Sequence, residues 1–399
     1  MDIKRALEDS EHYLMNTYGR LPVLLVKGRG TKVWGSDGKE YLDFVGGVAT
    51  NVLGHCYPKV VVAIQKQAQR LIHISNWYHI EPQLKLAKML VQNSFADKVF
   101  FCNSGTEAVE GAIKLARKYA SIFKHDKCTG IITALNSFHG RTMGALSATG
   151  QEKLRKGFEP ALGGFTHVPF GDAGAIEKAI TPDTCAVLLE PIQGESGVRI
   201  PPPEYLKDVR RICSDNNVLL ILDEIQTGMG RTGRLFAYEN SAITPDIMTL
   251  AKGLGAGMPI GALLATDKVA AAFNPGDHGS TFGGNPLATA AGTATMEALL
   301  EGGFILDQCR RMGSYLLKRL EEVAKKHSDI TVETRGAGLL VGMELNRECA
   351  PVISSCLERG LLVNCAAGKV IRMMPPLIVQ EEEIDRAIEI LDEALFRLN

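Results

Sequence analysis

A lysine without a carboxylate neighbour follows an apolar segment in the second half of the chain. Lys252 lies in TLAKGLGAGMP, between the run 246–251 and a loop with three glycines and a proline. Lysine is rarely buried completely, so the ordinary interpretation is a packed aliphatic stem whose ammonium group reaches water. In a dry pocket, desolvation would instead favour the neutral amine, a nucleophile toward carbonyl groups. The segment alone does not distinguish these interpretations.

Two further motifs follow predicted strands. Asp223 lies at the end of an apolar run, at the sheet edge where open α/β folds bind ligands, although it could also cap a helix. Ser104, Gly105 and Thr106 open a predicted helix, where free N–H groups and hydroxyls suit a phosphate or an ordinary helix cap. A phosphate site, a strand-end acid and a strand-end amine form the set that pyridoxal 5′-phosphate (PLP) needs for its phosphate, ring nitrogen and aldehyde.

Three glycines have the spacing of a dinucleotide-binding loop. Gly228, Gly230 and Gly233 have the G-x-G-x-x-G spacing and follow a predicted strand. In that motif the glycines open a helix, and an acidic residue follows about 20 residues later. Residues 234–245 have no helical face, and no clear acid follows them. We therefore predict a glycine-rich loop, with an NAD-dependent oxidoreductase as the alternative from another enzyme class.

The segments around these motifs predict a large α/β domain. Uniformly apolar runs are typical of parallel strands covered on both faces. Such runs occur at 98–102, 130–135, 184–192, 218–225, 246–251 and 261–266. Helices are expected at 106–119, 203–216, from 286 onward, 304–327 and 381–397, strands near 330–345, and an antiparallel meander at 21–44. The expected domains are a large one, 47–290, and a small α/β one formed by 1–46 and 291–399.

Composition limits the partners and the location. The 399 residues carry 44 Lys+Arg against 45 Asp+Glu, a net charge of −1 that gives no electrostatic reason to expect nucleic acid or a membrane surface. The N-terminus lacks the apolar segment of a signal peptide, and no apolar run approaches the ~18 residues of a spanning helix. Cys102 and Cys185 lie in apolar runs, as thiols of a reducing cytosol do. We predict a cytoplasmic protein that binds small molecules and no metal.

Seven motifs, in order along the chain, resemble those of the class III (fold type I) PLP-dependent aminotransferases. They are NSGTEA, SFHGRTMGALSATG, LLEPIQGESGV, LILDEIQTGMGRTG, TLAKGLGAGMPIGA, HGSTFGGNPLA and IRMMPPL. The similarity extends from Tyr18 to the last helix and is greatest to the acetylornithine aminotransferases. It implies a homodimer with shared active sites that transfers the δ-amino group of N2-acetyl-L-ornithine to 2-oxoglutarate. The products would be N-acetyl-L-glutamate 5-semialdehyde and L-glutamate, by a ping-pong mechanism of arginine biosynthesis.

The resemblance also assigns residues to the cofactor. Lys252 would attach to the cofactor aldehyde and, once released, move the proton between the substrate carbon and the cofactor. Asp223 would hold the pyridine nitrogen protonated, and Gln226 would bond the phenolic oxygen. Contacts with the phosphate or the ring are further implied for Ser104, Gly105, Thr106, Phe138 and the partner's Thr281.

Two arginines would bind the substrates. The resemblance gives Arg141 the α-carboxylate of acetylornithine, helped by the partner's Ser280, and gives Arg372 that of glutamate or 2-oxoglutarate. A planar guanidinium suits both positions because it pairs with a carboxylate through two parallel hydrogen bonds. Glu190 would cover Arg372 while the amine donor is bound and move away for the dicarboxylate. A helix-capping role is the alternative for Glu190.

One position helps to distinguish between possible amine donors. Ornithine-specific members carry a tyrosine where this chain has Val48, and the smaller side chain leaves room for an acyl group. Tyr18 is retained and does not discriminate. Other ω-aminotransferases, acting on succinyl-diaminopimelate, ornithine or 4-aminobutyrate, are the alternatives within the class. A non-catalytic protein on the same fold is disfavoured because Lys252 and Asp223 are both present.

Overall fold

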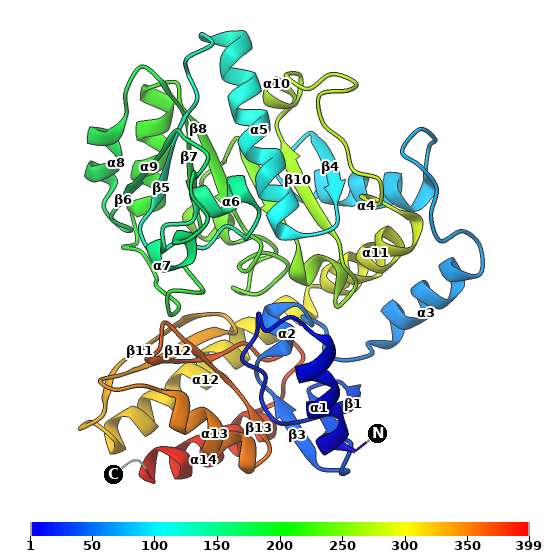
Figure 1. The fold of residues 1–399 in the computed structure, drawn as a ribbon, viewed down its shortest axis with the longest axis vertical. Coiled ribbons are helices and arrows are strands. Elements are labelled where there is room, and N and C mark those ends of the chain that lie inside the picture. Colours follow the sequence, from blue (N-terminus) through cyan, green and yellow to red (C-terminus); the bar gives the residue numbers. More distant parts are fainter. Residues whose placement is uncertain (1, 398–399) are drawn as a thin grey trace.

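The computed structural model describes residues 2–397, and the chain forms two parts stacked along the long axis of the molecule (Figure 1). The large part is built on a seven-stranded sheet with the order β4-β10-β9-β8-β7-β5-β6. Its strands are β4 (Lys98–Cys102), β5 (Gly130–Ala134), β6 (Phe165–Val168), β7 (Thr184–Leu189), β8 (Leu219–Asp223), β9 (Ile247–Leu250) and β10 (Gly261–Ala265).

The sheet is parallel from β6 to β9, and β10 runs antiparallel to both β9 and β4. Every residue of β7, β8, β9 and β10 is buried. Strands covered on both faces need apolar side chains on both faces, which explains the uniformly apolar runs. The six strands predicted for this region are all present, and the α/β fold with a mainly parallel sheet is confirmed.

The helices of the large part pack on the sheet or on one another, and one of them leads into the site. They are α3 (Pro58–Ala68), α4 (Glu81–Gln92), α5 (Gly105–Phe123), α6 (Met143–Ala148), α7 (Glu152–Arg155), α8 (Ala173–Ala179), α9 (Tyr205–Asp215), α10 (Asp267–Ala270) and α11 (Pro286–Leu300). The predicted apolar face of α5, with Ala112 and Ala116, is fully buried. Between β8 and β9 the chain forms the short 3₁₀ turn η1 (Ala237–Ser241) and no α-helix. The glycine loop 228–233 therefore lacks the helix that a dinucleotide site needs.

The small part combines both ends of the described chain. One four-stranded sheet has the order β1-β2-β3-β13, and the other has the order β11-β12-β15-β14. The strands are β1 (Leu25–Arg29), β2 (Lys32–Gly35), β3 (Glu40–Asp43), β11 (Thr331–Ala337), β12 (Leu340–Leu345), β13 (Leu361–Leu362), β14 (Asn364–Ala366) and β15 (Val370–Met373). The helices are α1 (Ile3–Tyr13), α2 (Gly46–Ala49), α12 (Phe304–Lys326), α13 (Ala350–Glu358) and α14 (Glu381–Phe396). Parallel pairing of β3 with β13 supports the proposed small domain of both termini.

Two of the nine cysteines are joined, which the sequence did not predict. Cys349 and Cys365 form a disulfide between the start of α13 and β14. The other seven are free, and burial raises the pKa of Cys102 and of Cys185 to about 12, as expected for inert buried thiols. None of the helices within residues 2–397 is long and apolar enough to cross a membrane.

Candidate active site

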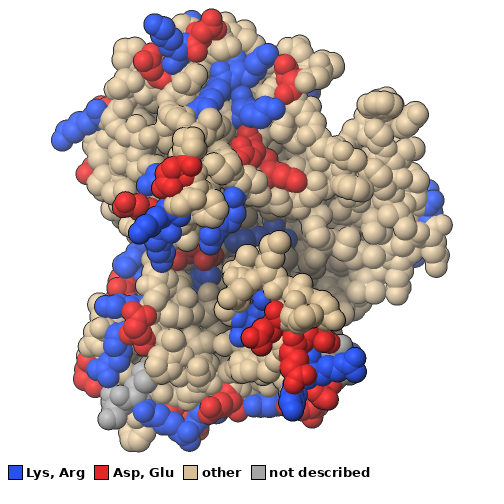
Figure 2. Space-filling model, viewed as in Figure 1, with Lys and Arg blue, Asp and Glu red and all other residues tan. Residues whose placement is uncertain are grey.

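A cavity of about 410 Å³ opens where the carboxyl ends of the parallel strands face the small part. We call it the central cavity. In the space-filling view a hollowed band separates the two parts, and basic and acidic side chains gather in it (Figure 2). The predicted site residues that line the cavity are Ser104, Gly105, Thr106, Phe138, Arg141, Glu190, Asp223, Gln226 and Lys252. Segments separated by up to about 150 residues therefore converge on one space.

One end of the cavity is the N-terminus of α5. The Ser104 hydroxyl caps the helix by accepting a hydrogen bond from the Glu107 N–H at 3.3 Å, while the hydroxyl of Thr106 bonds that of Thr142 at 2.8 Å. A Cβ at Gly105 would lie 2.8 Å from Cδ1 of Ile225, so glycine lets these two segments approach. Free N–H groups at the start of a 19-residue helix, flanked by hydroxyls, fit a phosphate.

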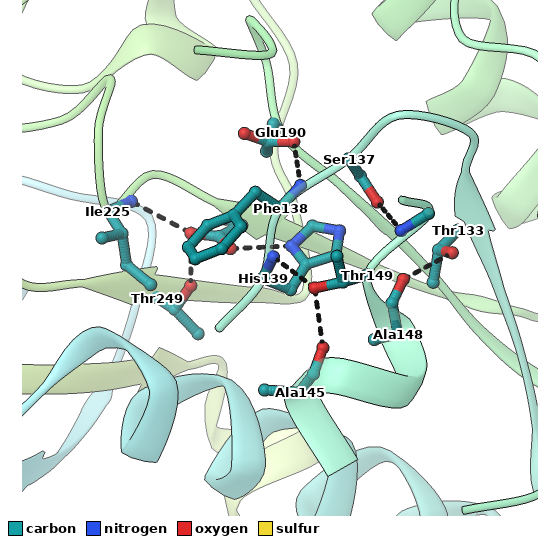
Figure 3. Close-up of polar contacts among 12 residues, drawn as sticks. Thr133, Ser137, Phe138, His139, Ala145, Ala148, Thr149, Glu190, Ile225 and Thr249 are labelled. Carbon is teal, nitrogen blue, oxygen red and sulfur yellow. Dashed lines mark hydrogen bonds and ion pairs between the residues drawn. The ribbon is translucent and has the colours of Figure 1, made fainter. Parts of the chain in front are cut away.

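Asp223 is held by three neighbours at the end of β8. Its carboxylate accepts hydrogen bonds from the Ile225 N–H at 3.1 Å and the Thr249 hydroxyl at 3.2 Å, and Nδ1 of His139 lies 2.8 Å from its other oxygen (Figure 3). Since an ionised carboxylate can only accept, the histidine donates from Nδ1. A fixed, buried carboxylate suits a cationic pyridinium nitrogen. His139 was not predicted, although it follows Phe138 in the FHGR motif.

Lys252 is the first residue of the 3₁₀ turn η2 (Lys252–Gly255), two positions after the end of β9, and it lines the cavity. Its φ is 41°, a left-handed conformation that side chains other than glycine rarely adopt, so the surrounding fold imposes it. Burial lowers the pKa of Lys252, and nearby carboxylates only partly oppose that shift. A larger neutral fraction makes the amine a better nucleophile toward an aldehyde than an exposed lysine.

Arg372, in β15, is covered by a glutamate, but not by the predicted one. Nη1 of Arg372 lies 2.9 Å from Oε1 of Glu195, and Nη2 lies 3.4 Å from Oε2. The same Nη1 donates to Oε1 of Gln226 at 3.1 Å, and Nε donates to Oδ1 of Asn364 at 3.1 Å. Burial raises the pKa of Glu195, but Arg372, Lys252 and Gln226 together outweigh burial and hold that pKa below its usual value.

The predicted pairing of Glu190 with Arg372 is therefore wrong. Glu190 ends the apolar run of β7 and accepts a hydrogen bond from the Phe138 N–H at 3.1 Å (Figure 3). Burial and the neighbouring Asp223 raise its pKa well above the usual value. The chain turns between Glu190 and Glu195, so the later glutamate is the one that reaches the small part.

Gln226 links the Arg372 pair to the cavity. Its Nε2 donates to Oε1 of Glu195 at 3.1 Å while its Oε1 accepts from Arg372. The second N–H of the amide remains for the predicted phenolic oxygen. A Cβ at Gly194 would lie 1.7 Å from Oε1 of Gln226, so only glycine leaves room for this arrangement.

Other predicted residues lie at the rim or elsewhere. Arg141 is exposed, with its guanidinium carbon 5.7 Å from the centre of the Phe138 ring. Ser280 and Thr281 lie in a different hollow with Glu107, where the Ser280 hydroxyl accepts from Asn103 at 3.2 Å. Neither lines the central cavity of its own chain, and delivery by a partner subunit stays a prediction.

Val48 and Tyr18 also lie outside the lining of the cavity. Val48 is 37% exposed and has a φ of 59°, within four consecutive left-handed residues, 46–49. A branched side chain at such a φ is strained, so the surrounding fold imposes this conformation. Tyr18 is exposed and lines a hollow beside α1. The preference for an acylated donor, inferred from the small side chain of Val48, therefore stays a prediction.

The arrangement of these residues fits PLP, and known proteins of similar sequence are aminotransferases. A family model described as aminotransferase class-III matches residues 13–395. The acetylornithine aminotransferase of Caldanaerobacter subterraneus subsp. tengcongensis is 56% identical, covering 96% of this chain and 97% of its own.

Two solved structures extend the likeness to the fold. An acetylornithine aminotransferase from Elizabethkingia anophelis has a TM-score of 0.89 and 32% identity over 100% of both chains. An ornithine aminotransferase from Toxoplasma gondii, in which PLP partly occupies the active site, has a TM-score of 0.95 and 35% identity over 99% of this chain and 94% of that one. The chain therefore belongs to the class III aminotransferases, PLP-dependent enzymes of fold type I.

Proposed function

We propose that this aminotransferase takes the δ-amino group from N2-acetyl-L-ornithine and gives it to 2-oxoglutarate, as a step of arginine biosynthesis. The observation that carries the proposal is the 56% identity, over nearly the whole chain, to a protein named acetylornithine aminotransferase. Arg372, behind the Glu195 and Gln226 side chains that line the cavity, supports it, because one site must accept an ω-amine and then an α-keto dicarboxylate.

The cavity residues divide the chemistry among them. When bound, PLP supplies an aldehyde that carries the amino group and a ring that withdraws electrons. Asp223 holds an anionic charge against the ring nitrogen, with His139 fixing its orientation. Lys252 takes the proton from the substrate carbon and returns it, and burial, which lowers its pKa, favours the neutral amine that accepts this proton. The N-terminus of α5 holds the phosphate.

The Arg372–Glu195 pair separates the two half-reactions. While the amine donor is bound, Glu195 neutralises Arg372, so the donor's own carboxylate has no free cation at that end. The α-carboxylate of 2-oxoglutarate displaces Glu195 and takes the planar guanidinium instead. Arg141, at the rim, binds the remote carboxylate of the donor. This exchange gives each substrate one productive orientation.

A donor panel tests the proposal. Steady-state kcat/KM with 2-oxoglutarate as acceptor should be highest for N2-acetyl-L-ornithine among acetylornithine, succinyl-diaminopimelate, ornithine and 4-aminobutyrate. A higher value for any other donor would replace acetylornithine with that donor. Lys252→Ala serves as the control for background transamination and should lose multiple turnover with every donor.

We also propose a homodimer with shared sites and a cytoplasmic location. Seven of the nine cysteines are free, as in a reducing compartment, whereas the Cys349–Cys365 disulfide is unusual there. In one chain, Thr281 lies outside the central cavity, as a residue that serves the partner would. Mixing inactive Lys252→Ala with a Thr281→Ala variant, after reversible dissociation, should restore part of the wild-type cofactor affinity in hybrid dimers. Hybrids no better than the Thr281→Ala dimer would refute the shared site.

A further inference from the structure

The disulfide lies one residue from the arginine network. Cys349 precedes α13 and Cys365 lies in β14, with their Cα atoms 5.8 Å apart and 16 positions apart in the chain. Cys349 is fully buried and Cys365 half-buried. The residue before Cys365 is Asn364, the acceptor for Nε of Arg372. The proposed reaction uses neither cysteine.

The strand that carries Asn364 is paired with another strand on one side only. β14 has three residues and is the outermost strand of its sheet, paired with β15 in the register Asn364↔Arg372 and Cys365↔Ile371. On its other side no strand within residues 2–397 pairs with it. An edge strand this short has few hydrogen bonds to keep its position.

The crosslink adds an attachment to two that β14 already has: its pairing with β15 and its continuation from β13, which pairs with β3. Cys349 is the N-cap residue of α13, and its N–H donates to the Gly368 carbonyl at 2.9 Å, in the turn between β14 and β15. That bond holds the turn, whereas the disulfide holds β14 itself, next to Asn364. Asn364 thus stands between a covalent tether and the guanidinium that meets the dicarboxylate.

We propose that the Cys349–Cys365 crosslink positions Asn364 against Arg372, so that the redox state of this cysteine pair sets the affinity for the dicarboxylate substrate. The proposal rests on the proposed function for the role of Arg372. Asn364 and the two cysteines are positioning residues: they act on the substrate through the guanidinium.

The redox step is ordinary thiol–disulfide exchange with a dithiol reductant. One thiolate of the dithiol attacks Sγ of the half-buried Cys365, and Cys349 leaves as a thiolate that takes up a proton. The second thiol of the reductant then attacks the mixed disulfide and releases Cys365. Two electrons and two protons pass to the cysteines, and the dithiol becomes a disulfide.

Reduction removes one anchor from β14 and leaves the cavity lining in place. Arg372 keeps Glu195 and Gln226 at its Nη atoms but loses a fixed acceptor at Nε, so its plane turns more freely. A bidentate pair depends on that plane. The donor, whose carboxylate lies at Arg141, does not depend on it.

The test compares the oxidised holoenzyme with holoenzyme reduced by dithiothreitol and then desalted. Alkylation and mass spectrometry should count seven free thiols in the first and nine in the second. Reduction should raise KM for 2-oxoglutarate by at least about fivefold and leave KM for the amine donor unchanged. Binding of glutarate, a dicarboxylate that cannot react, should weaken by the same factor in a calorimetric titration.

Variants separate the crosslink from general damage. Cys365→Ala should behave like the reduced enzyme in both states, and Asn364→Ala should show the weak dicarboxylate binding without any response to dithiothreitol. Cys356→Ala, which removes a free buried thiol on the same helix, should keep the wild-type response.

Three results would overturn the proposal: nine free thiols under oxidising conditions, equal glutarate affinity in both states, or an Asn364→Ala enzyme that still responds. If Cys365→Ala does not fold, the comparison of the two wild-type states decides. Because glutarate binding involves no amine donor, a wrong donor assignment would leave this test intact.

Discussion

Removing the charge of Glu195 should make the enzyme prefer dicarboxylates. In the resting structure Glu195 holds Arg372 through contacts of 2.9 and 3.4 Å, and the arginine side chain is 1% exposed. An incoming α-carboxylate must displace that glutamate before it can bind. Glu195→Gln keeps the shape and removes the competing anion, so the arginine becomes available to any carboxylate.

The size of the effect follows from the contact. A hydrogen bond to a charged group contributes about 1.5–3 kcal/mol, and the partly exposed Glu195 argues for the lower end. Since about 1.4 kcal/mol is a factor of ten, KM for 2-oxoglutarate should fall about tenfold. The kcat/KM for acetylornithine should fall by a comparable factor, because its own carboxylate can then bind Arg372 and hold the donor in the wrong orientation.

The assay is the ratio of kcat/KM for glutamate to that for acetylornithine as amine donors. Glu195→Gln should raise this ratio about tenfold. Glu190→Gln is the matched control, five positions earlier and bonded to the Phe138 N–H, and it should leave KM for 2-oxoglutarate near the wild-type value. An unchanged ratio in Glu195→Gln, or the larger change in Glu190→Gln, would refute the gate.

Three further outcomes are expected. Gly194→Ala should displace the Gln226 amide and raise KM for 2-oxoglutarate more than KM for the donor, because a Cβ there would lie 1.7 Å from Oε1. Val48→Tyr should shift relative kcat/KM from acetylornithine toward ornithine, and no shift would remove the acyl-pocket argument. Burial raises the pKa of Glu224 from 4.5 to about 8, so the neutral form stabilises the fold fully below pH 4.5 and loses that contribution as pH rises through 8. Chemical denaturation should therefore show the stability advantage of wild type over Glu224→Gln shrinking between pH 5 and pH 9.

The positions of Asp223 and Lys252 at strand ends could be predicted because buried parallel strands are uniformly apolar and are easily recognised in the sequence. The runs before Asp223 and Lys252 fix where each strand stops, and parallel strands end at a common edge, so the acid and the amine had to meet there. The cap before α5 follows similarly from small polar residues at a helix start. These inferences need only local pattern and sheet geometry.

The errors and omissions concern contacts between distant segments. Glu190 and Glu195 lie in one motif, and nothing local tells which of them meets an arginine about 180 positions later. His139 reaches Asp223 across 84 positions, and Cys349 meets Cys365 because α13 packs beside β14, with no recognisable spacing in the sequence. The available signal was the place of His139 directly after Phe138, a residue predicted to contact the cofactor. Its partner depended on tertiary packing.

Locating the cofactor's covalent attachment tests the central claim most directly. Purified holoenzyme treated with sodium borohydride, digested and mapped by mass spectrometry should carry a pyridoxyl group on Lys252, within TLAKGLGAGMP. The label should be absent from the Lys252→Ala variant treated in the same way. A pyridoxyl group on any other lysine, or an unmodified Lys252 in a fully loaded enzyme, would contradict the account.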